Sequence, residues 1–296
     1  MQQTSDQRTP LQQAGGTPSA LFIGGGNMAR AILEGAVAGR ALDPARVIVA
    51  EPGADKHAPF AALGARPVTA AGDGLALLDQ LDAPRWIVLA VKPQVLPEVS
   101  AELRASLAGR VDLGVITMLA GVPSDGVRAS LGGAVRVVRV MPNTPAQIRR
   151  GCTAVCAGAG AIEGDAGVAE RLFAAVGEVI PLEESLIDAF TGVAGSGPAY
   201  LFRMAEAMEA GAIEAGLDAD DARRIVRSVL TGSSLLLSSR GGDPGALREA
   251  VTSKKGTTAA GLDALQAGGF EDAVRSAILA ARDRGAALAE LASESG

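Results

Sequence analysis

Between residues 19 and 183 the sequence alternates short, uniformly apolar runs with longer stretches whose apolar residues recur at helical spacing. Strands that are apolar on both faces and separated by helices are typical of a parallel sheet covered on both sides. The expected strands are Ala20–Gly24, Val47–Ala50, Trp86–Val91, Gly114–Met118, Val135–Val140, Thr153–Cys156 and Val179–Leu182. The expected helices between them are Met28–Ala38, Ala54–Leu63, Gly74–Leu81, Leu96–Ala108, Ser124–Leu131 and Asp165–Val176. This pattern predicts an α/β domain with a doubly wound, mostly parallel sheet.

After about residue 184 the strand pattern stops and the sequence indicates only helices. We expect a long helical stretch over Glu184–Gly216, kinked at Pro198, because proline cannot donate a backbone hydrogen bond. Further helices are expected at Ala219–Ser238, Pro244–Val251, Thr258–Ala267 and Glu271–Ala292. Small and apolar residues recur at helical spacing within Tyr200–Ala215, as in a core face or a subunit interface. The predicted organisation is a flexible tail over 1–18, an α/β domain over 19–183 and an all-α domain over 184–296.

Charge and hydropathy exclude several classes of protein. The formal net charge is −6 and no long basic block is present, so the chain lacks the surface that nucleic acid requires. Residues 1–18 are polar and have no apolar signal-peptide core, and no apolar run is long enough for a membrane span. We therefore expect a cytoplasmic protein without a nucleic-acid or membrane partner.

The few cysteines and the single histidine limit which disulfides, metal sites and catalytic triads the chain can form. Cys152 and Cys156 are the only cysteines, and on a strand they would lie about 13 Å apart, too far for a disulfide. Two buried free thiols in a reducing compartment are expected instead. His57 is the only histidine, which argues against a zinc site or a Ser-His-Asp triad. No metal site is predicted.

A glycine-rich turn follows the first expected strand. Gly24-Gly25-Gly26-Asn27-Met28-Ala29 has the G-x-G-x-x-A pattern in the strand-turn-helix context of a dinucleotide site, which predicts a Rossmann-type domain. Gly24 permits the tight turn, and Gly26 lets the backbone approach a pyrophosphate. The helix that begins at Asn27 and Met28 would offer free N–H groups to the phosphates. The expected cofactor is NADPH or NADH.

Glu51 ends the second expected strand, where an acidic residue usually accepts hydrogen bonds from the ribose hydroxyls of NAD. Lys56 is close in sequence and would instead meet the 2′-phosphate of NADP. Both are also compatible with solvated loop charges. The preference between the two cofactors is therefore left open.

Three further segments bring polar groups to places where a substrate can bind. Ala90-Val91-Lys92-Pro93 and Met141-Pro142-Asn143 end two strands, and ligands of open α/β sheets bind at that edge. The third segment, 251–262, joins two helices and carries Thr252, Ser253, Thr257 and Thr258. Its hydroxyl and N–H groups at a helix start suit a carboxylate. A helix N-cap alone would account for one or two of them.

In order, GGGNMA, AVKPQ, MPNTPA, GSGPAY and VTSKKGTTAAGL resemble pyrroline-5-carboxylate reductases over about residues 20–285. The resemblance implies NAD(P)H-dependent reduction of a cyclic C=N bond to give L-proline. It also implies a homodimer with interleaved helical domains, assembling into a larger homo-oligomer.

By the same resemblance, Thr258 would hold the ring nitrogen, and Ser253 with the backbone of Thr257 would bind the substrate carboxylate. Pro142, Asn143 and the Lys92-Pro93 turn would shape the nicotinamide pocket. Positioning of the two reactants would be the main contribution to catalysis. No strong general base is required.

One segment departs from the family pattern. Lys254 and Lys255 stand where the family commonly has Pro-Gly. Their charge would either attract an anionic substrate or remain merely solvated.

Two other kinds of protein share part of this pattern. A β-hydroxyacid dehydrogenase would share both halves but needs a catalytic lysine on a long helix, and residues 188–216 contain none. A non-catalytic dinucleotide sensor would have no use for the hydroxyls of Ser253 and Thr258.

Overall fold

The computed structural model describes residues 17–239 and 242–294 of the chain. The chain forms two compact units, Met1–Gly195 together with Ala281–Gly296, and Ser196–Ala280. The predicted tail over 1–18 falls almost entirely outside the described residues.

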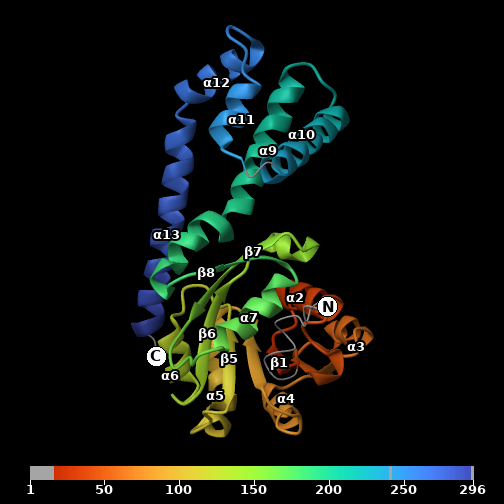
Figure 1. Ribbon diagram of the computed structural model, residues 1–296, viewed down its shortest axis with the longest axis vertical. Helices are drawn as coiled ribbons and strands as arrows, with labels where there is room; N and C mark the ends of the chain where they lie inside the picture. The colour runs from red at the N-terminus through yellow and green to blue at the C-terminus, as the bar shows by residue number, and fades with distance from the viewer. Residues whose placement is uncertain (1–16, 240–241, 295–296) are drawn as a thin grey trace, which may run out of the picture. The chain divides into compact units, whose positions relative to one another are not determined.

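The first unit contains an eight-stranded sheet, with the order β3-β2-β1-β4-β5-β6-β7-β8 among the described residues (Figure 1). The strands are β1 Ser19–Ile23, β2 Val47–Ala50, β3 Arg66–Val68, β4 Arg85–Leu89, β5 Leu113–Thr117, β6 Arg136–Met141, β7 Gly151–Ala157 and β8 Gly177–Pro181. β1 to β6 are parallel, β7 is antiparallel to β6, and β8 is parallel to β7. The predicted class, a Rossmann-type and mostly parallel sheet, is confirmed.

The sheet is buried on both faces at β1, β2, β4 and β5, because the residues of these strands are largely apolar. In β1, Ala20 and Phe22 enter one hydrophobic cluster while Leu21 and Ile23 enter the other. The first cluster is completed by α2 (Asn27–Ala38), α3 (Ala58–Ala62) and α7 (Asp165–Ala174). The second is completed by α4 (Ala71–Leu78), α5 (Leu96–Leu107) and α6 (Ser124–Ser130). The two-residue period of a strand therefore sends alternate side chains to opposite helical layers.

Two details of the sheet were not anticipated. β3 carries Arg66 and Pro67 and has three residues, so its sequence gives no apolar signal; it lies at the sheet edge, where proline is tolerated. β7 runs antiparallel because only a short 3-10 turn, η4 (Thr144–Ile148), joins it to β6. A parallel return requires a crossover of a dozen or more residues.

The two cysteines lie in β7 and are unpaired. Cys156 is buried, and this burial raises the pKa of its thiol to about 11. Cys152 is only half-buried, so the expectation of two buried thiols holds for one of them. Cys152 lies at the start of β7, where the strand leaves the core.

The remainder of the chain is helical, as predicted. Its elements are η5 Glu184–Leu186, α8 Ile187–Phe190, the π-helical turn η6 Thr191–Gly195, α9 Gly197–Glu214, α10 Ala219–Ser239, α11 Pro244–Ala250, α12 Thr257–Ala267 and α13 Phe270–Glu294. The expected kinked helix is instead broken at η6, and Pro198 stands in the first turn of α9. Proline is favoured there because the N–H groups of a first turn have no helical acceptor.

The end of α13 belongs to the first compact unit. Leu288 lies against Gly121, and Gly285 lies against Asp188. The predicted domain boundary after residue 183 does not follow this division by compactness, and it stays a prediction.

The second unit exposes many apolar side chains. Among its described residues, only Ala222 and Val226 are buried hydrophobics. Exposed large apolar residues include Leu201, Phe202, Ile213, Ile225, Val229, Leu235, Leu265, Phe270 and Val274. Extended apolar surface of this kind marks an interaction face. Separately, no helix in the ranges 17–239 and 242–294 has the length and apolar character to cross a bilayer.

Candidate active site

The glycine turn is pressed against the end of β4. Gly24 has φ +99°, and a Cβ there would lie 2.8 Å from the Ala90 carbonyl oxygen and 2.9 Å from Val91 Cγ1. The Ala90 N–H also donates to the Ile23 carbonyl at 2.9 Å. Glycine is therefore required at position 24, and the predicted residues Gly24, Ala90 and Val91 do lie together.

The start of α2 is open to a ligand. Gly26 is its N-cap residue, no side chain caps the helix, and a Cβ on Gly26 would meet nothing within 4 Å. Gly26 and Asn27 are exposed and Met28 is half-buried. The first N–H groups of a helix lack internal partners and carry the positive end of its dipole. This open helix start fits a pyrophosphate.

Glu51 fastens the glycine turn to the end of β2. Its side chain is almost fully buried, and Oε2 accepts a 2.9 Å hydrogen bond from the Gly25 N–H. Oε1 accepts from the Gly53 N–H at 3.2 Å and from Lys56 Nζ at 3.0 Å. A carboxylate offers about four lone-pair sites, so room remains for one further donor.

These contacts set the protonation of Glu51. Burial alone would raise its pKa, but hydrogen bonds from Gly25, Lys56 and Gly53 outweigh burial and hold the pKa below its ordinary value. The folded turn therefore stabilises the ionised form of the Glu51 carboxyl group. Contacts that lower a carboxyl pKa contribute stability above the unfolded-state pKa and lose it as the pH falls through the folded-state pKa.

We predict that Glu51→Gln lowers the free energy of unfolding at pH 7 by about 1 to 3 kcal/mol, because hydrogen bonds to a charged group are lost. The difference between wild type and variant should shrink as the pH falls below the ordinary carboxyl pKa and through the lowered pKa of the folded state, because the wild-type carboxyl then becomes protonated too. Urea unfolding at pH 7 and at a series of more acidic pH values measures this difference. A pH-independent difference would contradict the role assigned to the ionised carboxylate.

The other predicted cofactor residues lie at the ends of β4 and β6. Lys92 is exposed and caps the 3-10 turn η3 (Pro93–Val95) directly after β4. Pro142 is buried at the end of β6. β5 separates the two strands, so these ends lie along one edge of the sheet.

Asn143 joins three parts of the first unit. Its Nδ2 donates to the Ala194 carbonyl in η6 at 3.0 Å, and its Oδ1 accepts from the Cys152 N–H at 2.9 Å. Asn143 is buried, so both backbone groups depend on its amide. This contact places the end of β6 against the turn that leads into α9.

We predict that Asn143→Leu lowers the free energy of unfolding by about 2 to 4 kcal/mol, because two partly buried backbone groups lose their partners. The exposed neighbour Thr144 provides a control, and Thr144→Ala should change stability by less than about 0.5 kcal/mol. Chemical denaturation of the apoprotein compares them. Equal stability of Asn143→Leu and wild type would show that the Asn143 amide does not stabilise the contact between the end of β6, β7 and η6.

The predicted substrate segment lies in the second unit, between α11 and α12. Thr252 Oγ1 donates to the Arg248 carbonyl at 2.6 Å, and the Gly256 N–H donates to the Ser253 carbonyl at 3.0 Å. Gly256 is the N-cap of α12, and a Cβ there would collide with Ser253 Oγ. Thr257 and Thr258 occupy the first helical turn, exposed and with no side-chain cap before them.

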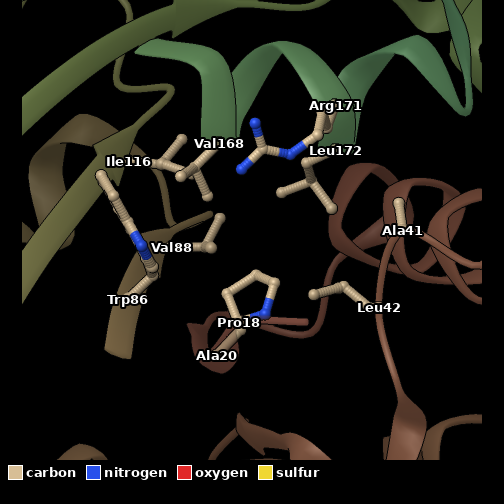
Figure 2. A pocket seen from close by; sticks show the side chains of 10 residues that line it. All are labelled: Pro18, Ala20, Ala41, Leu42, Trp86, Val88, Ile116, Val168, Arg171 and Leu172. Atoms are coloured by element: carbon tan, nitrogen blue, oxygen red, sulfur yellow. The ribbon is translucent and has the colours of Figure 1, made fainter. Parts of the chain in front are cut away.

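A small crevice elsewhere in the first unit is not part of the predicted site. Figure 2 shows it between Trp86, Val88 and Ile116 of the sheet, and Val168, Arg171 and Leu172 of α7. Its cavity of about 10 Å³ is the size of one water molecule. None of the predicted site residues lines it.

Sequence reasoning missed a partly buried polar network near the end of β6. Arg139 Nη1 lies 3.0 Å from Glu184 Oε1, which also accepts from the Ser124 N–H at 2.7 Å. Ser124 Oγ donates to Glu184 Oε2 and accepts from the Ala159 N–H. These residues are up to 60 positions apart, so no local signal could have paired them.

An open helix start after a glycine turn, on a doubly wound sheet, is the arrangement of a Rossmann dinucleotide-binding domain. Two family models match the chain. Residues 184–288 match "Pyrroline-5-carboxylate reductase dimerisation", and residues 20–121 match "NADP oxidoreductase coenzyme F420-dependent".

Individual relatives extend the match to most of the chain. The pyrroline-5-carboxylate reductase of Pseudomonas aeruginosa is 35% identical over 275 residues, covering 93% of this chain and 98% of the relative. The solved structure of the Coxiella burnetii pyrroline-5-carboxylate reductase is 33% identical, with TM-score 0.82, covering 92% of this chain and 99% of that one.

A Plasmodium falciparum pyrroline carboxylate reductase solved with NADP bound shares the fold at TM-score 0.78 and 22% identity, covering 92% of this chain and 98% of that one. The chain belongs to the pyrroline-5-carboxylate reductase family.

Proposed function

We propose that this protein reduces 1-pyrroline-5-carboxylate to L-proline with NADPH or NADH. The proposal rests on the observation that this chain, a member of the family, has two helix starts suited to the two reactants. One is the open start of α2 behind Gly24, which suits a dinucleotide. The other is the hydroxyl-rich start of α12, which suits a small carboxylate.

When bound at the start of α2, the cofactor would supply a hydride to the imine carbon. An imine nitrogen that is already protonated, or that receives a proton, would then become CH–NH without a negative charge on nitrogen. Thr258 is proposed to hold that nitrogen through its hydroxyl, and Ser253 with the Thr257 N–H to bind the carboxylate. The unbonded N–H groups of the first turn of α12 support this assignment.

The cofactor residues are proposed by position. Gly24, Gly26, Asn27 and Met28 would receive the pyrophosphate. Glu51 would hold the turn in shape and accept one ribose hydroxyl, while Lys56 would meet a 2′-phosphate. Ala90, Val91, Lys92, Pro93, Pro142 and Asn143 would surround the nicotinamide.

The exposed apolar surface of the second unit supports a homodimer. Leu201, Phe202, Ile225 and Val229 would be covered by a second copy, consistent with the dimerisation model that matches this region. We further propose that dimers assemble into a larger homo-oligomer and that the enzyme works in the cytoplasm. Sedimentation of the purified protein distinguishes monomer, dimer and larger particle.

The proposed reaction is tested by mixing the protein with 1-pyrroline-5-carboxylate and either NADPH or NADH. Oxidation of the cofactor is followed as a loss of its absorbance at about 340 nm. Turnover with at least one cofactor is expected. Folded protein that binds NADPH but turns over neither would contradict the proposal and favour the dinucleotide sensor. Turnover of a β-hydroxyacid but not of the imine would favour the dehydrogenase alternative.

A further inference from the structure

The chain uses lysine in very few places. It has four lysines and 23 arginines. All four lysines lie in segments assigned to ligands: Lys56 after β2, Lys92 after β4, and Lys254 with Lys255 before α12. Arginine supplies the basic charge everywhere else in the chain.

Arginines of the second unit are mostly neutralised by neighbours one helical turn away. The pairs are Arg203–Glu206 at 2.8 Å, Arg223–Asp220 at 3.0 Å, Arg224–Asp221 at 2.5 Å and Arg275–Asp272 at 2.8 Å. Lys254 and Lys255 differ from them. Both are exposed, and neither ammonium lies within 4.0 Å of a carboxylate in the part of the chain that the structure describes.

The backbone adds a second distinction. Lys255 has φ +60°, in the left-handed region, which favours glycine over residues that carry a Cβ. The loop thus holds a charged residue at a position whose geometry favours glycine. Lys255 is the residue directly before the Gly256 N-cap, and the exposed Thr257 and Thr258 follow that N-cap.

We infer that Lys254 and Lys255 form an electrostatic collector for the anionic substrate, drawing its carboxylate to the start of α12. This inference rests on the proposed function of that loop. A net charge of −6 opposes the approach of an anion to the protein as a whole. Two unneutralised ammonium groups beside the site reverse the local potential and raise the rate of productive encounter.

The test compares three double variants by steady-state kinetics with 1-pyrroline-5-carboxylate at saturating cofactor. Lys254→Gln with Lys255→Gln removes both charges, and Lys254→Arg with Lys255→Arg retains them. Arg104→Gln with Arg227→Gln is the matched control, since both arginines are exposed and lack an ion pair among the described residues. Each variant is measured at about 0.01 M and about 1 M KCl, where the screening length falls from about 30 Å to about 3 Å.

We expect the double glutamine variant to lose about tenfold in kcat/KM at low salt, with kcat unchanged and the loss gone at high salt. The arginine variant and the control should match wild type within twofold. Unchanged kcat/KM at low salt, a loss that persists at high salt, or an equal loss in the control would each overturn the inference. Failure of wild type itself to turn over the substrate would overturn the proposed function instead.

Discussion

Thr258→Ala is expected to reduce kcat/KM for 1-pyrroline-5-carboxylate by about 10²- to 10³-fold, the usual effect of removing one positioned hydrogen-bonding group at the reacting centre. Thr258 is exposed in the first turn of α12, so its hydroxyl is not needed for packing. The variant should therefore keep the unfolding midpoint and cofactor affinity of wild type. The loss should appear in kcat, because the contact is made where the reaction occurs.

Thr258→Ser is the matched variant, since it keeps the hydroxyl and removes only the methyl group. It should retain activity within about tenfold of wild type. Stopped-flow oxidation of bound NADPH separates the hydride step from product release for each variant. Alanine and serine variants that both match wild type would remove Thr258 from the site.

Gly24→Ala is expected to damage folding and cofactor binding together. The new methyl would lie 2.8 Å from the Ala90 carbonyl oxygen, and φ +99° is unfavourable for alanine. We expect the free energy of unfolding to fall by about 2 to 4 kcal/mol, from overpacking and backbone strain combined. The turn should also shift away from β4 and weaken NADPH binding by at least about tenfold.

Gly26→Ala separates the two effects. A Cβ at Gly26 meets no protein atom within 4 Å, so the variant should fold within about 1 kcal/mol of wild type. Its methyl would occupy the space proposed for the pyrophosphate, and NADPH affinity should still fall at least about tenfold. Fluorescence titration with NADPH and urea unfolding measure both quantities. Normal NADPH affinity in Gly26→Ala would show that the phosphates bind elsewhere.

The layered fold was predictable because its signals are local. Uniformly apolar runs such as Val47–Ala50 are typical of strands buried on both faces, and the glycine turn follows the first of them directly. The antiparallel β7 was not predicted, because its direction depends on the length of η4 rather than on its own residues. β3 was missed because its three residues give no apolar pattern.

The places of the predicted site residues along the strands followed from the sequence, whereas their contacts did not. Glu51 was expected at the end of β2, but its bond to the Gly25 N–H joins residues 26 apart and has no sequence signal. Asn143 was expected at the nicotinamide pocket, and the structure adds that its amide links Cys152 and Ala194. The Arg139–Glu184 pair spans 45 residues and was missed. Contacts of this kind depend on the assembled sheet.

Hydride transfer to the imine carbon is the central claim, and isotope transfer tests it most directly. Wild-type protein would be given 1-pyrroline-5-carboxylate with NADPH or NADH deuterated on either face of the nicotinamide C4, and the product analysed by mass spectrometry and NMR. The account predicts L-proline carrying a single deuterium on Cδ, from one face of the cofactor only. Proline without deuterium from both labelled forms of the cofactor, deuterium at another carbon, or no proline at all would contradict it.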